Sequence, residues 1–102
     1  MNDEEMCADI RRRVARPQNT NPPFSARTDT ADCAAKRIRA SVSVEAEGEE
    51  FDRALLNFLT VARRNICNFE RPSMRAFAGR GWRYTYTFTA ANGELRRAEV
   101  EC

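Results

Sequence analysis

The chain has 102 residues, of which 42% are hydrophobic and 31% are charged. This length supports one compact domain, since domains usually have about 50 to 250 residues, and the apolar fraction is too high for a wholly disordered chain. The 17 basic and 15 acidic residues are interspersed and give a net charge of +2, so no large field of one sign is expected. No stretch approaches the roughly 20 apolar residues that span a bilayer, so we expect no membrane span.

The first 16 residues are predicted to form a helix. Asn2 can cap its start, and Glu5 lies three residues further on, as in a capping box. A narrow apolar stripe follows at helical spacing and comprises Met6, Cys7, Ile10 and Val14. Pro17 ends the pattern, and residues 17–32, which contain two asparagines and a Pro-Pro pair, are predicted to be a linker or loop.

A strand and a long helix are predicted next. From Lys36 the apolar residues alternate with polar ones, which is typical of a strand with one wet face. The apolar face comprises Ile38, Ala40, Val42, Val44 and Ala46, and the polar face Arg37, Arg39, Ser41, Ser43, Glu45 and Glu47. Glu49 to about Ile66 then carries an apolar stripe at helical spacing, formed by Phe51, Leu55, Phe58, Leu59, Ala62 and Ile66. Residues Arg71–Ala78 can add one or two helical turns.

A hairpin is predicted to close the chain. In its first strand, Trp82, Tyr84, Tyr86 and Phe88 alternate with Arg83, Thr85, Thr87 and Thr89. The dipeptide Asn92-Gly93 favours a type I′ turn. Ala98, Val100 and Cys102 continue a second strand, whereas Leu95 is out of phase with them, which predicts a bulge or a loose start there.

The predicted fold is therefore α+β, with an N-terminal helix followed by strand-helix-strand-strand. The strands form a three-stranded, mainly antiparallel sheet, and the long helix packs on one of its faces because each element has one apolar side to bury. Residues 1–102 make a single domain. It consists of the helix 1–16, the linker 17–32 and an α+β core over 33–102.

Four widely spaced cysteines, Cys7, Cys33, Cys67 and Cys102, bear on both chemistry and compartment. Structural zinc sites and redox pairs need closely spaced ligands or thiols, which are absent here, and the chain has no histidine. The four cysteines predict two disulfides and hence a periplasmic or secreted protein. The acidic first residues do not form a signal peptide, so we expect this chain to be the mature form, with Met1 in place of a removed leader.

The predicted topology favours particular disulfides. The long helix descends beside a rising strand and the final hairpin rises and returns, so Cys67 and Cys102 are expected at the same end of the sheet. Cys67–Cys102 is the preferred pair, which leaves Cys7–Cys33 to attach the first helix to the sheet. Cys33–Cys67 and Cys33–Cys102 stay open, since sequence alone does not fix connectivity.

Part of the chain resembles a broad group of known proteins. A helix ending in Cys67, the run Gly81-Trp82-Arg83-Tyr84-Thr85-Tyr86, the Asn92-Gly93 turn and the terminal Cys102 are similar to small exported bacterial disulfide-containing α+β proteins of uncharacterised function. The resemblance covers about residues 36–102. It implies a location in the envelope or outside the cell, and it implies no activity.

The side chains needed for common catalytic mechanisms are missing or badly placed. The chain has no histidine, which is the commonest general base in enzymes. Catalytic triads and metal sites that depend on histidine are therefore excluded. The serines do not lie in a nucleophile-elbow motif. Alternating carboxylates on a wet strand face are more often solvated, or paired across strands, than catalytic. We therefore predict a protein without enzymatic activity, cofactor or metal.

Binding another macromolecule is the predicted function, in the manner of an inhibitor, an immunity protein or an accessory subunit. The aromatic row of residues 82–88 is needed as a core surface for the long helix, so nucleic-acid stacking on it is not expected. The opposite sheet face is polar and uncovered, and its predicted partner-binding residues are Arg37, Arg39, Arg83, Thr85 and Thr87. The alternative is a binder of an anionic polymer, either nucleic acid or lipid headgroups. It would use the cluster Arg11, Arg12, Arg13 and Arg16.

Overall fold

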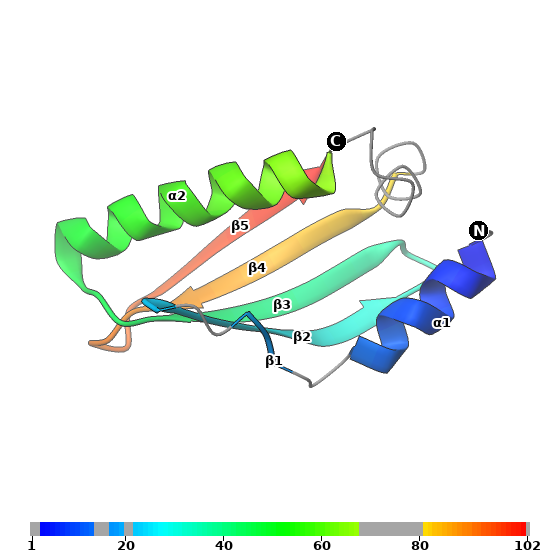
Figure 1. Cartoon of the computed structure of the whole chain (residues 1–102), viewed down its shortest axis with the longest axis horizontal. Coiled ribbons are helices and arrows are strands. Elements are labelled where there is room, and N and C mark those ends of the chain that lie inside the picture. The colour runs from blue at the N-terminus through cyan, green and yellow to red at the C-terminus, as the bar shows by residue number, and fades with distance from the viewer. Residues whose placement is uncertain (1–2, 14–16, 20–21, 68–80, 102) are drawn as a thin grey trace.

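The computed structural model describes residues 3–13, 17–19, 22–67 and 81–101. Their elements, in chain order, are α1 (Asp3–Arg13), β1 (Pro17–Asn19), β2 (Phe24–Asp32), β3 (Arg37–Val44), α2 (Gly48–Ile66), β4 (Arg83–Thr89) and β5 (Leu95–Glu101). The strands form one mixed sheet in the order β1-β2-β3-β4-β5 (Figure 1). β3 and β4 are parallel, and the other neighbouring strands are antiparallel. The predicted α+β class, the two helices and the three predicted strands are confirmed. The prediction of a three-stranded, mainly antiparallel sheet is wrong in part, because the sheet also contains β1 and β2 and because β3 and β4 pair in parallel.

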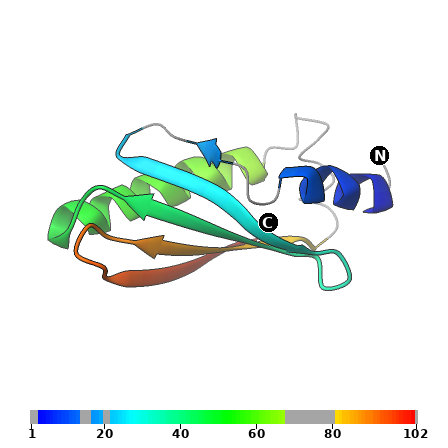
Figure 2. The ribbon, with the colours of Figure 1, turned by 90° about the horizontal axis from the view of Figure 1, so that it is seen from below.

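The long helix α2 covers one face of the sheet, as predicted, and lies behind it in Figure 2. The alternation in β3 is confirmed, because every second residue from Ile38 to Val44 is buried. On the helix, Phe51 is fully buried and Ile66 is 5% exposed. These residues belong to one apolar cluster that joins α2 to β3, β4 and β5.

Aromatic rings fill the space between α2 and β4. The Phe58 ring lies edge-on to Tyr86 and Phe88, at centroid distances of 5.2 and 5.4 Å. On its other side it lies 5.4 Å from Phe24 of β2. Edge-on contacts of this kind add stability beyond the area they bury. The prediction that the aromatic row serves as core is confirmed, since Phe88 is 0% and Trp82 2% exposed.

The predicted linker over residues 17–32 is wrong, because most of it forms strand β2 and three of its residues form β1. β2 pairs along its length with β3, and the pairing shifts between Thr28 and Thr30. Such a bulge inserts an extra residue and reverses the side-chain phase. On the helix-covered side β2 presents mostly small residues, so the period of two that marks a strand is weak. Its apolar side chains on that face are Phe24, Ala26 and Ala31.

The final hairpin forms, but its turn is longer than predicted. The Ala90 N–H donates to the Glu94 carbonyl, and the Gly93 N–H donates back to Ala90. Gly93 has φ 87° whereas Asn92 does not have a positive φ, so the turn is not type I′. A three-residue loop that ends in a left-handed glycine is the next common solution. Leu95 pairs in register with Thr89 without a bulge, and it is 59% exposed on the face that α2 does not cover.

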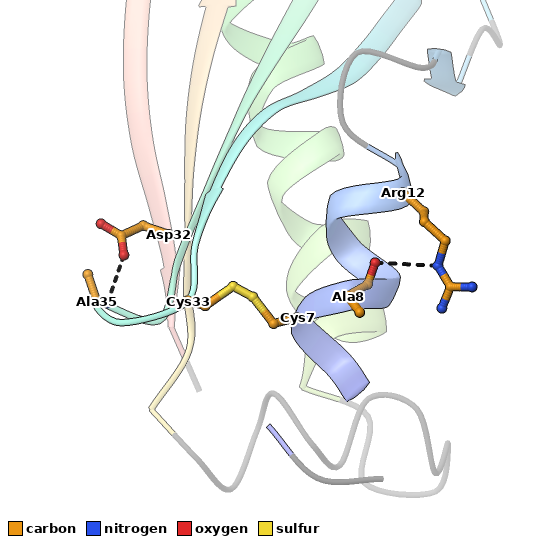
Figure 3. Close-up of a disulfide and its surroundings, with 6 residues drawn as sticks. All are labelled: Cys7, Ala8, Arg12, Asp32, Cys33 and Ala35. Atoms are coloured by element: carbon orange, nitrogen blue, oxygen red, sulfur yellow. Dashed lines mark hydrogen bonds between the residues drawn. A yellow bond between two sulfur atoms is a disulfide. The ribbon is translucent and has the colours of Figure 1, made fainter. Parts of the chain in front are cut away.

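Helix α1 packs against the end of the sheet through a second, smaller apolar cluster. Its members are Cys7 and Ile10 of α1, Ile38 of β3, and Trp82 just before β4. Cys7 is disulfide-bonded to Cys33 in the β2–β3 turn, with a Cα–Cα distance of 5.9 Å (Figure 3). In the same turn, the Ala35 N–H donates to the Asp32 carboxylate at 3.0 Å. The predicted Cys7–Cys33 pair is thus confirmed.

Cys67 is also disulfide-bonded, and no described cysteine is free. The carboxyl ends of α2 and β5 lie at the same end of the sheet (Figure 1), which is the arrangement on which the Cys67–Cys102 prediction was based. Cys102 lies outside the described residues, so that pairing stays a prediction. The helical turns predicted for Arg71–Ala78 lie outside them as well.

The Cys7–Cys33 bond is expected to stabilise the fold and to hold α1 against Trp82. The bond spans a sequence separation of 26, for which the chain-entropy model gives about 3.5 kcal/mol. Replacing both cysteines, as Cys7→Ser with Cys33→Ser, should lower the free energy of unfolding by about that amount in urea titrations. The emission of Trp82, the chain's only tryptophan, should also shift to the red. Ala34→Ser in the same turn is the control, and an unchanged unfolding free energy in the double variant would contradict the assignment.

Candidate functional site

The open face, defined as the sheet face opposite α2, is polar across four strands. Among the described residues no helix covers it, because α1 and α2 both contact apolar side chains of the other face. Paired residues of neighbouring strands point to the same side of a sheet. The open face therefore carries Ser25, Arg27, Thr30 and Asp32 on β2, Arg37, Arg39, Ser41 and Ser43 on β3, Arg83, Thr85, Thr87 and Thr89 on β4, and Leu95, Arg97, Glu99 and Glu101 on β5.

A shallow hollow of about 510 Å³ lies in the middle of the open face. It is lined by Asp29, Thr30, Arg37, Arg39, Ala40, Thr85, Thr87, Arg97, Ala98 and Glu99. Four of the five residues predicted from the sequence to bind a partner therefore meet in one place. The fifth, Arg83, pairs with Arg37 in the β3–β4 register and lies beside the hollow, not in its lining.

The two carboxylates of the hollow already have hydrogen-bond donors. The Ser41 hydroxyl donates to Asp29, and the Arg27 Nε donates to the same carboxylate at 3.1 Å. The Thr85 hydroxyl donates to Glu99 at 3.5 Å. The bulge between Thr28 and Thr30 places Asp29 as an extra residue in β2, beside Ser41.

The three arginines of the hollow, in contrast, have no ion-pair partner among the described residues. Arg37, Arg39 and Arg97 form no salt bridge there, although Arg27 of the same face pairs with Asp29. The Nε atom of Arg37 is buried and lacks a hydrogen-bond partner in the described part of the chain. A buried donor without a partner costs roughly 1 to 3 kcal/mol. The hollow therefore presents unused guanidinium donors, and guanidinium groups bind carboxylates and phosphates in a bidentate manner.

The N-terminal arginine cluster predicted as the alternative site is not assembled in the described residues. Arg12 donates to the Ala8 carbonyl at 3.4 Å within its own helix and lies 3.7 Å from the Asp9 carboxylate (Figure 3). Arg11 is exposed, the side chain of Arg13 is not described, and Arg16 lies outside the described residues.

A second hollow, of about 440 Å³, lies between α2 and the sheet and is mostly apolar. It is lined by Pro22, Phe24, Asn57, Phe58, Val61, Ala62, Asn65, Ile66, Tyr84 and Tyr86. No charged residue is among them. Burial, with a smaller contribution from neighbouring Tyr84, raises the pKa of Tyr86 far above its usual value near 10. Tyr86 is thus a neutral phenol across the physiological range.

No described group of His, Cys, Asp and Glu side chains is placed to hold a metal ion. None of the helices over the described residues has both the length and the apolar character needed to cross a bilayer. Comparison of the chain with known protein families, with curated proteins and with solved structures found no match. The resemblance to small exported bacterial proteins therefore remains a prediction.

Sequence reasoning missed four polar residues of the hollow, Asp29, Thr30, Arg97 and Glu99. The phase of β5 could have placed two of them, because Ala98 and Val100 were predicted to point inward and their neighbours must point outward. Asp29 could not be found this way. It lies in the strand that was predicted to be a linker, at the one position where that strand's phase breaks.

The buried Tyr86 should make stability fall at high pH. A phenol whose folded pKa lies above its unfolded value stabilises the fold below pH 10, and this contribution is lost as pH rises above 10. At pH 11 the loss amounts to about 1.4 kcal/mol. We expect the free energy of unfolding to fall by about that much more between pH 8 and pH 11 in the native protein than in Tyr86→Phe. Parallel curves for the two proteins would contradict the assignment.

Proposed function

We propose that this protein is a non-enzymatic binding domain whose open face docks an acidic segment of another protein. The observation that supports this most is the cluster of guanidinium groups in the hollow that have no ion-pair partner in the described part of the chain, while the carboxylates of the hollow already accept hydrogen bonds. Other arginines of the described surface do have such partners within the chain, as Arg27, Arg53 and Arg96 do. A partner's carboxylates would supply what the hollow lacks.

The spacing of the arginines suggests an extended segment. Arg37 and Arg39 lie two residues apart on β3 and point to the same face. Their Cα atoms are therefore about 6.6 Å apart, which is also the distance between alternate residues of an extended peptide. Such a peptide, with acidic side chains at every second position, can offer one carboxylate to each guanidinium. Thr85 and Thr87, on the neighbouring strand, add hydroxyl groups beside them.

The proposal includes action in an oxidising compartment, the periplasm or the medium. The Cys7–Cys33 bond and the disulfide-bonded state of Cys67 support it, since stable disulfides are rare in the cytosol. In this setting the roles that fit are those of an inhibitor, an immunity protein or an accessory subunit of an envelope complex.

The acidic-partner proposal is tested with a fluorescent peptide of alternating glutamate and serine. We expect saturable binding, read by anisotropy, that weakens about tenfold in Arg39→Glu because a repulsive charge replaces a bidentate donor. Arg64→Glu, an exposed change of the same charge on α2, is the control and should bind as the native protein does. Equal weakening in both variants would show that the effect comes from the net charge of the protein and not from the hollow. Tighter binding of single-stranded DNA or polyphosphate than of the peptide would favour the anionic-polymer alternative instead.

The compartment is tested by the thiol state of protein isolated from its natural source. Alkylation under native and denaturing conditions, followed by intact-mass measurement, should find no modified cysteine until a reductant is added. Peptide mapping of the unreduced protein should recover a Cys7–Cys33 linkage and a Cys67–Cys102 linkage. Alkylated Cys7 and Cys33 in unreduced material would show that the protein works in a reducing compartment.

A further inference from the structure

We propose that β5 pairs with β5 of a second copy of this chain, giving a two-fold symmetric dimer with one sheet running through both copies. β5 is the last strand of the sheet, and Figure 2 shows no other helix or strand of the described residues beyond its outer edge. The opposite margin is different, because there the three-residue β1 pairs with β2. This inference concerns the edge of the sheet; Arg97 and Glu99 of that edge also line the hollow, but the inference does not depend on the acidic-partner proposal.

The backbone groups available at this edge follow from the hairpin. The Ala90 N–H donates to the Glu94 carbonyl at 2.9 Å, so residues 90 and 94 form a hydrogen-bonded pair. Hydrogen-bonded and non-bonded pairs alternate along antiparallel strands, and the β4–β5 register continues without a shift. The N–H and C=O groups of Arg96, Ala98 and Val100 therefore face β4. Those of Leu95, Arg97, Glu99 and Glu101 face outward and have no partner strand among the described residues.

The charge order of β5 selects a second copy as the partner. Its first half carries Arg96 and Arg97 and its second half Glu99 and Glu101. An antiparallel copy centred on Ala98 places Arg97 opposite the partner's Glu99, and by symmetry Glu99 opposite the partner's Arg97. Charged residues are a common defence of sheet edges against pairing, but in this order they attract an antiparallel copy of the same strand.

Neighbouring registers are disfavoured by the same charges. A two-fold axis perpendicular to the sheet places the open faces of both copies on the same side. The pairing must then be centred on one residue that lies opposite its own copy, and near the middle of β5 this residue can be Arg97, Ala98 or Glu99. Centring on Arg97 brings two arginines face to face, and centring on Glu99 brings two glutamates together, and like charges directly opposite are destabilising. Ala98 is also the midpoint of Leu95–Glu101, so its register gives the longest overlap. In all three registers the outward-facing residues pair with one another, as hydrogen bonding requires, so the charges and the overlap select the register centred on Ala98.

The dimer is expected to be weak. One pair of strands buries less surface than the roughly 1,200 Å² or more of a standard interface, so we expect a Kd on the order of 0.1 mM. Sedimentation equilibrium from about 0.01 to 1 mM should show a monomer–dimer transition that weakens with added salt.

Charge-swap variants test both the occupant and the register. Arg97→Glu and Glu99→Arg each place like charges opposite one another and should weaken the dimer by about tenfold or more. The double variant, Arg97→Glu with Glu99→Arg, restores opposite charges and should return to near the native Kd. Arg64→Glu is the control for net charge, and circular dichroism checks that each variant is folded. A double variant no better than its single parents would overturn the proposed register.

Amide hydrogen exchange reads the pairing directly. In dilute protein the amides of Arg97 and Glu99 should exchange rapidly, whereas those of Ala98 and Val100 are protected by β4. Raising the concentration through the Kd should protect Arg97 and Glu99 and leave Ala98 and Val100 unchanged. A protein that stays monomeric at 1 mM, or a dimer in which the Arg97 and Glu99 amides stay unprotected, would overturn the proposal.

Discussion

Burial of one continuous apolar face beneath α2 is the constraint on which the rest of this structure depends. The parallel register of β3 and β4 sets Ile38 beside Tyr84, Ala40 beside Tyr86 and Val42 beside Phe88, so both strands present their apolar residues to the helix together. Because side chains alternate along a strand, a slip of one residue would move an entire apolar set into water. The same alternation brings Arg37, Arg39, Thr85 and Thr87 together on the other face. The polar hollow thus follows from the register that forms the core.

At the β2–β3 turn, the helix-covered face is completed by α1. Ile38 and Trp82 lie beyond the main cluster and pack against Cys7 and Ile10. A single narrow helical stripe offers few contacts, and small domains bury a limited share of their surface. The Cys7–Cys33 bond compensates for these few contacts, because it restricts the conformations of the unfolded chain between residues 7 and 33 and so lowers the entropy lost on folding. The disulfide and the apolar contacts therefore both hold α1 against the end of the sheet at the β2–β3 turn.

The two helices and the strands β3, β4 and β5 could be predicted from their apolar periods, whereas β1 and β2 could not. β3, α2 and β4 each repeat large apolar residues at a period of two or at helical spacing, and the structure confirms all three. Apart from Phe24, β2 offers only alanine and threonine to the helix-covered face, and the extra residue Asp29 breaks its period, so the sequence predicts a linker there. The hollow was predicted in part for the same reason. Arg37 and Arg39 lie on a strand whose phase was clear, whereas Asp29 lies on one whose phase was not.

Arg97 takes part in both the proposed acidic-partner site and the proposed dimer, because it lines the hollow and lies on the outer edge of β5. In the proposed dimer its guanidinium faces the partner's Glu99, so the hollow keeps Arg37 and Arg39 as its unpaired cations. An acidic segment that reaches Arg97 must compete with strand pairing, and linkage requires each event to weaken the other by the same factor. A segment confined to Arg37 and Arg39 leaves pairing unaffected, because β4 separates their strand from β5. The position of the partner's acidic residues thus decides whether binding is coupled to the oligomeric state.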